Sequence, residues 1–171
     1  MQKNLLIIGA GMYAVVAYEI ATEIGDFQKI DFVDDVKTQT PNGAFVVGRI
    51  RDVARLSSQY AGIVVAIGNA QIRVSLIDQI EQVAPNRIVT LISPKAHVSP
   101  SAQLAKGCLI EPMAVVHSNC VLDEACIISA GAVVNHAAIC RKGVHIDCNA
   151  TVAGYVVVPE YTKVPAGHTY V

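Results

Sequence analysis

The sequence has little charge, and its charged residues are not clustered. Lys, Arg, Asp and Glu make up 16% of the 171 residues, and 13 basic against 14 acidic side chains give a formal net charge of -1. Binding to nucleic acid or to an anionic membrane surface requires a concentrated basic face, because many phosphates must be neutralised together. We therefore expect neither kind of partner.

Long hydrophobic runs are also missing. Apolar stretches such as residues 62–67 are much shorter than the roughly 20 residues that cross a bilayer. The apolar stretch after Lys3 meets glycines within a few residues, so it does not have the form of a signal peptide. We expect a soluble cytoplasmic protein without a membrane span.

The sequence contains no CxxC pair, and its number of cysteines is odd. The five cysteines are Cys108, Cys120, Cys126, Cys140 and Cys148. This pattern indicates neither a disulfide framework nor a structural zinc site.

Residues 1–91 alternate apolar runs with amphipathic stretches. Strands are expected at residues 4–8, 29–33, 62–67 and 88–92, and helices at residues 14–24, 49–60 and 70–83. Alternation of strands and helices predicts a parallel sheet covered by helices. Residues 1–91 are therefore expected to form a small Rossmann-like parallel α/β domain.

After Ile92 the helical pattern stops and a repeat of six residues begins. Every sixth residue from Ile92 to Val164 is a branched aliphatic, apart from Cys140, and the residue four places later is small in most repeats. One large and one small inward residue per hexad suit a parallel β-helix with three faces. Residues 92–171 are expected to form this β-helix, with Cys108 and Cys126 stacked as small hydrophobic residues. The spacing leaves the handedness open.

Two histidines lie in the segment VVNHAAICRKGVHIDCNATVAG, which begins at Val133. His136 is third in its hexad and His145 is last in the next. One face spans roughly 20 Å at about 3.3 Å per residue, so the two imidazoles cannot form a dyad within one chain. If three β-helices pack as a symmetric homotrimer, a histidine of one chain can approach a cleft lined by the next. The alternative is that both histidines are solvated surface side chains.

The first expected strand and helix are joined by a glycine-rich loop. Gly9, Gly11 and Ala14 have the G-x-G-x-x-A spacing, and Asp34 follows about twenty residues later, in outline a dinucleotide-binding fingerprint. Taken alone, this motif suggests NAD. Because the residues before the hexads suffice for only one mononucleotide half, we expect the loop to bind the phosphates or the uracil end of a UDP-sugar. The alternative for Asp34 and Asp35 is a plain polar loop.

Five segments carry a family resemblance by their order and spacing. They are GAGMY at Gly9, FVDD at Phe32, AIGNAQIR at Ala66, LISPKAHVSPSA at Leu91 and VNHAAICRKGVH at Val134. Together they resemble the NeuD/PglD-type family of hexapeptide-repeat sugar acyltransferases, which includes sialic-acid O-acetyltransferases and UDP-4-amino-sugar N-acetyltransferases. The resemblance covers nearly the whole chain and implies a left-handed β-helix. It also implies direct acetyl transfer from acetyl-CoA to an amino or hydroxyl group of a nucleotide-linked sugar, without a metal.

The resemblance assigns a role to individual residues. His136 falls on the general base, which removes a proton from the attacking group. His145, Gly154 and Ala166 fall on positions that bind acetyl-CoA, with His145 at the thioester. The positions that bind the nucleotide sugar are Gly11, Met12, Tyr13, Asp34, Asp35, Gly68 and Gln71.

The chain departs from the family pattern at two places. The family usually has Asp or Glu directly after the catalytic histidine, where this chain has Ala137, so we expect an imidazole without a supporting carboxylate. The family also continues for further coils, whereas this chain stops at Val171, so the distal CoA contacts are expected to be missing or differently built. These departures support a second reading, a trimeric sugar-nucleotide-binding protein that has lost turnover.

A third reading is a β-helix zinc hydrolase of the carbonic-anhydrase type. Such a site needs three imidazoles that converge on the metal. The spacing of His117 and His136 is expected to offset their side chains on neighbouring coils. The sequence leaves open which sugar is the acceptor and whether nitrogen or oxygen is acetylated.

Overall fold

The computed structural model describes residues 3–171, which form two compact units. The first unit runs to Val89 and the second spans Thr90–Val171. The division falls close to the boundary after residue 91 that the change of sequence pattern predicts.

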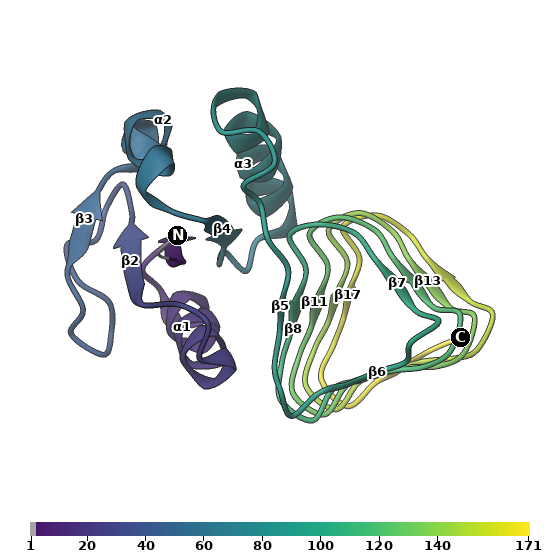
Figure 1. Ribbon diagram of the computed structural model, residues 1–171. Coiled ribbons are helices and arrows are strands. Elements are labelled where there is room, and N and C mark those ends of the chain that lie inside the picture. Colours follow the sequence, from purple (N-terminus) through teal and green to yellow (C-terminus); the bar gives the residue numbers. More distant parts are fainter. Residues whose placement is uncertain (1–2) are drawn as a thin grey trace. The chain divides into compact units, whose positions relative to one another are not determined.

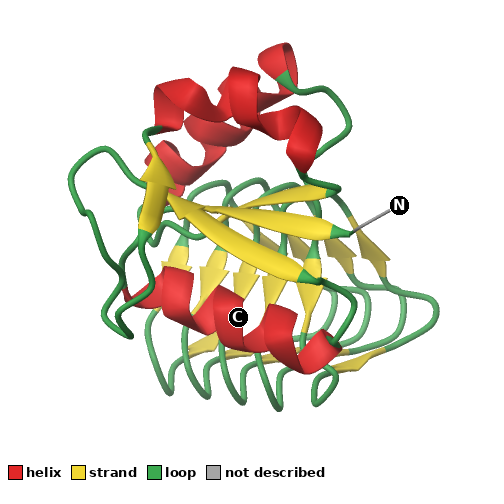
Figure 2. Ribbon diagram, turned by 60° about the vertical axis from the view of Figure 1, so that its left-hand side comes forward, coloured by secondary structure: helices red, strands yellow, loops and turns green. Residues whose placement is uncertain are grey.

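The first unit is a four-stranded parallel sheet with helices on both faces (Figures 1 and 2). Its strands are β1 (Asn4–Ile8), β2 (Lys29–Val33), β3 (Val46–Gly48) and β4 (Gly62–Val65), in the order β3-β2-β1-β4. Its helices are α1 (Met12–Ile24), α2 (Val53–Leu56) with the 3-10 turns η1 (Ile50–Asp52) and η2 (Ser57–Gln59) on either side, and α3 (Ala70–Val83). Helix α1 covers one face of the sheet, and α2 and α3 cover the other.

The alternating pattern is confirmed, with two corrections. Strand β3 was not expected. The strand expected at residues 88–92 is wrong, because Ile88 forms a single bridge to Ile63 in the first unit, while β5 (Leu91–Ile92) pairs with a strand of the second unit. One apolar run crosses the boundary between the units, and hydrophobicity alone cannot show that its two ends pair with different partners.

Burial on both faces explains why the strands of the first unit are uniformly apolar. Residues 5–8 of β1 are fully buried between the two helical layers, as in other covered parallel sheets. Helix α1 begins after Gly11 and ends at Gly25, which has a φ of 75° and caps the helix in the left-handed conformation. The glycine-rich loop is therefore held between the buried strand β1 and the helix α1.

The second unit is a parallel β-helix with three faces, which Figure 1 shows as the three sides of a triangle. Its strands are β5 (Leu91–Ile92), β6 (His97–Val98), β7 (Gln103–Leu104), β8 (Leu109–Ile110), β9 (Val115–Val116), β10 (Val121–Leu122), β11 (Ile127–Ile128), β12 (Val133–Val134), β13 (Ile139–Cys140), β14 (His145–Ile146), β15 (Thr151–Val152), β16 (Val157–Val158), β17 (Lys163–Val164) and β18 (Thr169–Tyr170). The sheets have the orders β17-β14-β11-β8-β5, β18-β15-β12-β9-β6 and β16-β13-β10-β7. Each pairing joins residues one coil apart, as in Ile110↔Ile128↔Ile146.

The hexad residues form the core of the β-helix. From Ile110 to Val158 every residue of the large series is buried, and Cys108, Cys120 and Cys126 occupy small positions beside them. Burial raises the pKa of the Cys140 thiol to about 12, which keeps it protonated and apolar. Four of the cysteines are therefore small core residues, and Cys148 is exposed.

The corners of the β-helix have a periodicity of their own. Every sixth residue from Gly107 to Gly167 has a positive φ, and in most of these residues the N–H donates to a carbonyl of the preceding coil, as Ala137 N does to Ser118 O at 3.0 Å. Glycine and asparagine adopt this conformation readily, whereas other side chains cost roughly 1–2 kcal/mol. The large side chains in this series are those of Met113, Tyr155 and Tyr161.

Candidate active site

His136 lies at the corner that follows β12, with its side chain exposed. The side-chain oxygen of Asn135 accepts two hydrogen bonds from it, one from the backbone N–H at 2.8 Å and one from Nδ1 at 2.7 Å. An amide oxygen can only accept, so Nδ1 carries the proton and the lone pair of the neutral imidazole is on Nε2. The structure therefore fixes the tautomer that a general base requires.

The imidazole has no supporting carboxylate in this arrangement, but it has a neutral partner in Asn135. Ala137 has a φ of 56° at the corner and offers no carboxylate, as the sequence indicates. The oxygen that orients the ring comes instead from Asn135, the residue before the histidine. A neutral amide holds the ring but stabilises the imidazolium less than a carboxylate does.

Gly154 lies one coil beyond His136 and makes room for its ring. A Cβ at Gly154 would be 2.9 Å from Nε2 and 3.2 Å from the carbonyl oxygen of His136. Any side chain at this position would occupy the space beside Nε2. The glycine therefore leaves the lone pair of the imidazole accessible.

Tyr155 follows this glycine and packs against the imidazole. The two ring centroids are 5.1 Å apart, and the ring planes are nearly perpendicular, at 85°. The backbone N–H of Tyr155 also donates to the carbonyl of His136 at 3.1 Å. His136 thus lies between the amide of Asn135, the open position at Gly154 and an exposed aromatic ring.

His145 has a different environment. It lies in β14, in another sheet of the β-helix, and is buried. Its Nε2 is 3.0 Å from the hydroxyl of Ser129, which donates to Glu111 Oε1 at 3.2 Å. Because the hydroxyl has one proton, it accepts from Nε2–H of His145. Burial raises the pKa of Glu111 above its ordinary value, although the hydrogen bonds from Ala130 N and Ser129 oppose this.

The residues assigned to acetyl-CoA are therefore not gathered at one corner. Gly154 lies against His136, whereas Ala166 is exposed at the corner that follows β17. The carbonyl of Ala166 accepts from Nδ1 of His168 at 2.9 Å. Within one chain, Gly154 is the assigned CoA-binding residue that lies next to the imidazole of His136.

A second candidate site lies in the first unit, at the amino end of α1. It is a pocket of about 320 Å³ lined by Gly9, Ala10, Gly11, Met12, Tyr13, Asp34, Lys37, Ala66, Ile67 and Gly68. Gly9 has a φ of 107°, and a Cβ there would be 3.1 Å from Ala66 O, so glycine is required. Arg73 is fully buried in α3 and fixes the floor of the pocket by donating from Nη1 to Ile67 O and Gly68 O, at 2.8 and 3.0 Å.

Asp34 closes the loop around this pocket. Its carboxylate accepts hydrogen bonds of 2.8 Å from the backbone N–H groups of Ala10, Val36 and Lys37. Burial alone would raise the pKa of Asp34, but these three hydrogen bonds, with the charge of Lys37, hold it below its ordinary value of 3.8. The amino end of helix α1 carries the partial positive charge of the helix dipole, and together with the ammonium of Lys37 it makes this pocket suited to an anion.

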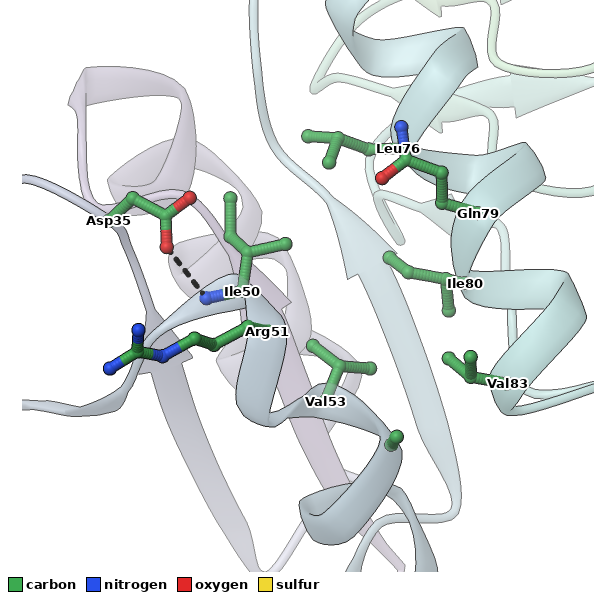
Figure 3. A pocket seen from close by; sticks show the side chains of 9 residues that line it. Asp35, Ile50, Arg51, Val53, Leu76, Gln79, Ile80 and Val83 are labelled. Carbon is green, nitrogen blue, oxygen red and sulfur yellow. Dashed lines mark hydrogen bonds between the residues drawn. The ribbon is translucent and has the colours of Figure 1, made fainter.

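Asp35 belongs to a different pocket, drawn in Figure 3. This cavity of about 350 Å³ lies between α2 and α3 and is lined by Asp35, Ile50, Arg51, Val53, Ala54, Leu76, Gln79, Ile80 and Val83. The carboxylate of Asp35 accepts from Ile50 N at 3.0 Å, and its carbonyl accepts from the Arg49 guanidinium. Gln71 is exposed in the first turn of α3 and does not line either pocket. The structure thus groups Gly11, Met12, Tyr13, Asp34 and Gly68, and separates Asp35 and Gln71 from them.

Two further properties of the chain concern metals and membranes. Within residues 3–171, no group of three or more His, Cys, Asp or Glu side chains is arranged to hold a metal ion. Across the same residues, every helix is too short or too polar to cross a bilayer.

The sequence interpretation missed three residues of these sites: Asn135, Tyr155 and Lys37. Tyr155 could have been noticed in the sequence, because glycine, asparagine or alanine occupies the equivalent position of most hexads. Asn135 adjoins the predicted base, but sequence alone does not show that its amide folds back onto the ring. Lys37 lies near the glycine-rich loop because the segment after β2 folds back toward it, which the sequence does not show.

Comparisons with known proteins show what this chain is similar to. Residues 4–80 match the model of the PglD N-terminal domain. The acetyltransferase domain of PglB from Neisseria gonorrhoeae FA1090, solved in complex with acetyl coenzyme A, is 30% identical, with a TM-score of 0.92 over 99% of this chain and 82% of that one. A histidine-to-asparagine variant of perosamine N-acetyltransferase from Caulobacter crescentus, solved with CoA and GDP-perosamine, is 26% identical, with a TM-score of 0.81 over 100% of this chain and 90% of that one. No curated protein shows significant similarity to the sequence.

Proposed function

Because the chain belongs to the PglD/NeuD-type family of left-handed β-helix sugar acetyltransferases, we propose that it transfers the acetyl group of acetyl-CoA to the amine of a nucleotide-linked amino sugar. The observation that carries the proposal is the imidazole of His136, held by Asn135 in the tautomer with its lone pair on Nε2, beside the open position at Gly154. A perosamine N-acetyltransferase among the relatives, bound to GDP-perosamine, favours an amine as the acceptor.

His136 acts as the general base in this proposal. The amine nitrogen attacks the thioester carbonyl carbon while Nε2 takes the amine proton. A nitrogen–carbon bond forms, the carbon–sulfur bond breaks, and CoA leaves as a thiolate that takes the proton from the imidazolium. Asn135 holds the ring throughout, because Nδ1 remains protonated in both states. The reaction requires no acyl-enzyme.

The acetyl-CoA site comprises Gly154, His145 and Ala166. Gly154 admits the thioester beside Nε2, because a side chain there would fill this space. Both Nε2 and the backbone N–H of His145 have partners within the chain, in Ser129 and Thr162. His145 therefore contributes to the CoA site through its remaining surface or by fixing this part of the β-helix.

The nucleotide sugar binds to the pocket of the first unit. The diphosphate lies at the amino end of α1, where the backbone N–H groups and Lys37 offer positive charge, with Gly11, Met12, Tyr13 and Gly68 around it. The carboxylate of Asp34 holds the loop in place through its hydrogen bonds to backbone N–H groups. Asp35 and Gln71 lie outside this pocket and contact only the more distant parts of the ligand.

The active form is a homotrimer, in which the sugar held by one chain reaches the imidazole of another. The three flat faces of the β-helix are suited to packing around a threefold axis. We place the enzyme in the cytoplasm, where acetyl-CoA is available.

The proposal is tested by measuring free thiol released from acetyl-CoA with a panel of UDP-, GDP- and CMP-linked amino sugars and sialic acids. We expect wild-type turnover with at least one amino sugar. Replacement of His136 by Ala should lower kcat about 10² to 10⁴-fold, the usual contribution of a general base. Asn135→Ala should lower kcat less, because the base remains but its tautomer and orientation are no longer fixed.

The control is His97→Ala, which removes an exposed histidine from β6 and should leave kcat unchanged. Binding of acetyl-CoA should be nearly equal in all four proteins. Equal turnover in wild type and His136→Ala would contradict the role of the base. Ligand binding without acetylation of any acceptor would favour a binding protein, and acetylation of a hydroxyl would identify an O-acetyltransferase.

A further inference from the structure

Tyr155 is an exposed aromatic side chain directly beside the imidazole of His136. It is 77% exposed, although its ring lies 5.1 Å, centroid to centroid, from that of the histidine. A large aromatic side chain gains little stability from so exposed a position, since most of its apolar surface remains in water. Packing within the chain therefore does not explain why this corner carries a tyrosine.

The backbone conformation makes this residue type more unusual. Tyr155 has a φ of 64°, at a corner position that is occupied by Asn119 and Ala137 in the two preceding coils on the same edge. A bulky side chain is disfavoured in this conformation, whereas asparagine is tolerated. Strained residues cluster at binding and catalytic sites, where the side chain has a use that offsets the strain.

The geometry shows what the ring can reach. The acceptor atom must come within about 2.6–3.2 Å of Nε2 to give up its proton, so the sugar carbon that carries it is only one bond further away. The ring of Tyr155 contacts the same imidazole and is open to solvent on its other sides. A sugar whose acceptor atom lies at Nε2 is therefore within reach of the tyrosine ring.

Aromatic rings are suited to this contact. The face of an aromatic ring is electronegative, and the C–H bonds on one face of a pyranose carry small positive partial charges, so the two attract each other and exclude water. The phenol hydroxyl in addition offers a donor and an acceptor to the sugar hydroxyls.

We propose that Tyr155 is a specificity-determining residue of the acetyl-transfer site, whose ring stacks on the acceptor sugar and holds it against His136. The proposal rests on the function proposed above. It assigns Tyr155 to the sugar, because the acceptor atom must be within hydrogen-bond distance of Nε2 when it gives up its proton, and the kinetic test below distinguishes this contact from one with acetyl-CoA.

Two matched variants test this role. Tyr155→Asn removes the ring and places a residue that tolerates the left-handed conformation. Tyr161→Asn makes the same change at the next corner, where φ is 60° and the backbone N–H donates to Lys142 O at 2.9 Å, in the way that Tyr155 N donates to His136 O. Both variants should fold and melt at or above the temperature of the wild type, since both relieve the same backbone strain.

The kinetic constants should separate the two. In Tyr155→Asn we expect the KM of the acceptor sugar to rise about tenfold, the upper range for one aromatic contact, with the KM of acetyl-CoA unchanged. Tyr155→Phe should recover most of the affinity, because the ring remains. Tyr161→Asn should have wild-type constants for both substrates.

The remaining outcomes would overturn the assignment. If only kcat falls in Tyr155→Asn, the ring merely positions the imidazole, and if only the KM of acetyl-CoA rises, the ring belongs to the co-substrate. A change in sedimentation of Tyr155→Asn would make the residue part of a subunit contact. Wild-type protein without acetyl transfer would instead contradict the proposed function, which His136→Ala tests separately.

Discussion

At the scale of single residues, the two candidate sites depend on side chains that accept hydrogen bonds from the backbone. Asn135 accepts from the N–H of His136 and from its ring, and Asp34 accepts from three N–H groups of the glycine-rich loop and the segment after β2. In both cases one polar side chain fixes a loop that the sequence pattern does not determine. The resulting geometry is sensitive to a single substitution.

The carboxylate of Asp34 gives a pH-dependent prediction. Because its pKa is lowered in the folded protein, its contribution to stability is complete above the ordinary value of 3.8 and is lost as the pH falls through the folded value. Asp34→Asn should lower the free energy of unfolding at pH 7 by about 1–2 kcal/mol, since a charged acceptor is replaced by a neutral one.

Thermal unfolding of wild type and Asp34→Asn at pH 7 and at pH 3 measures this effect. The difference should shrink at pH 3. Asp26→Asn is the control, because Asp26 forms only an exposed ion pair with Lys3 at 3.2 Å and should change little at either pH. A difference for Asp34→Asn that is equal at both pH values would show that the charge of Asp34 does not stabilise the loop.

At the scale of secondary-structure elements, the β-helix consists of strands of two residues, of which one points inward. In β15 the inward residue is Val152, which is fully buried, and the outward residue is Thr151, which is half-buried. Val152 pairs with Val134 in the preceding coil, so the same aliphatic column continues through the core. The inward residue of each two-residue strand is therefore expected to contribute most of the stability of the β-helix.

The two neighbouring positions of β15 provide a test of this distribution. Val152→Ala removes two methyl groups from the core and should lower the free energy of unfolding by about 2 kcal/mol, including the cost of the cavity. Thr151→Ala should cost less than about 0.5 kcal/mol, as is usual for surface positions. Urea denaturation followed by far-UV circular dichroism measures both values. Equal losses would show that the inward residue has no special part in the core.

At the scale of the whole molecule, one face of the β-helix is partly apolar on its outer side. One sheet of the β-helix has an outward column of Val121, Ile139 and Val157, and the last of these is 47% exposed. Aliphatic side chains that face outward in a regular column favour packing of this face against another copy. This column is consistent with a homotrimer built on the β-helices.

Sedimentation equilibrium tests the assembly. Wild-type protein at micromolar concentration should sediment with three times the chain mass of 18.1 kDa. Ile139→Lys places a charge in the outward column and should shift the protein toward the monomer, with a parallel loss of acetyl transfer. Gln103→Lys, at the first strand of the same sheet, is the control for the added charge. A stable wild-type monomer that still transfers acetyl groups would contradict both the trimer and a site shared between chains.

The elements that follow from a local period could be predicted from the amino-acid sequence alone. A strand that is buried on both faces must be apolar throughout, as residues 5–8 are, and a β-helix must place an aliphatic residue inward at every sixth position, as Ile110, Ile128 and Ile146 show. These patterns express backbone geometry, so they can be read without knowledge of the rest of the fold. The place of His136 as the third residue of its hexad follows from the same count.

Which side chains meet at the corners of the β-helix depends on how the coils stack in three dimensions. Tyr155 and Gly154 reach the ring of His136 because successive coils stack in register, and the amide of Asn135 reaches it because of its side-chain rotamer. The same holds for Asp34 and Asp35, which are adjacent in the chain but line different pockets, since successive side chains leave the end of a strand in different directions. Contacts of this kind depend on the orientation of side chains across elements, and a periodic sequence pattern does not specify that orientation.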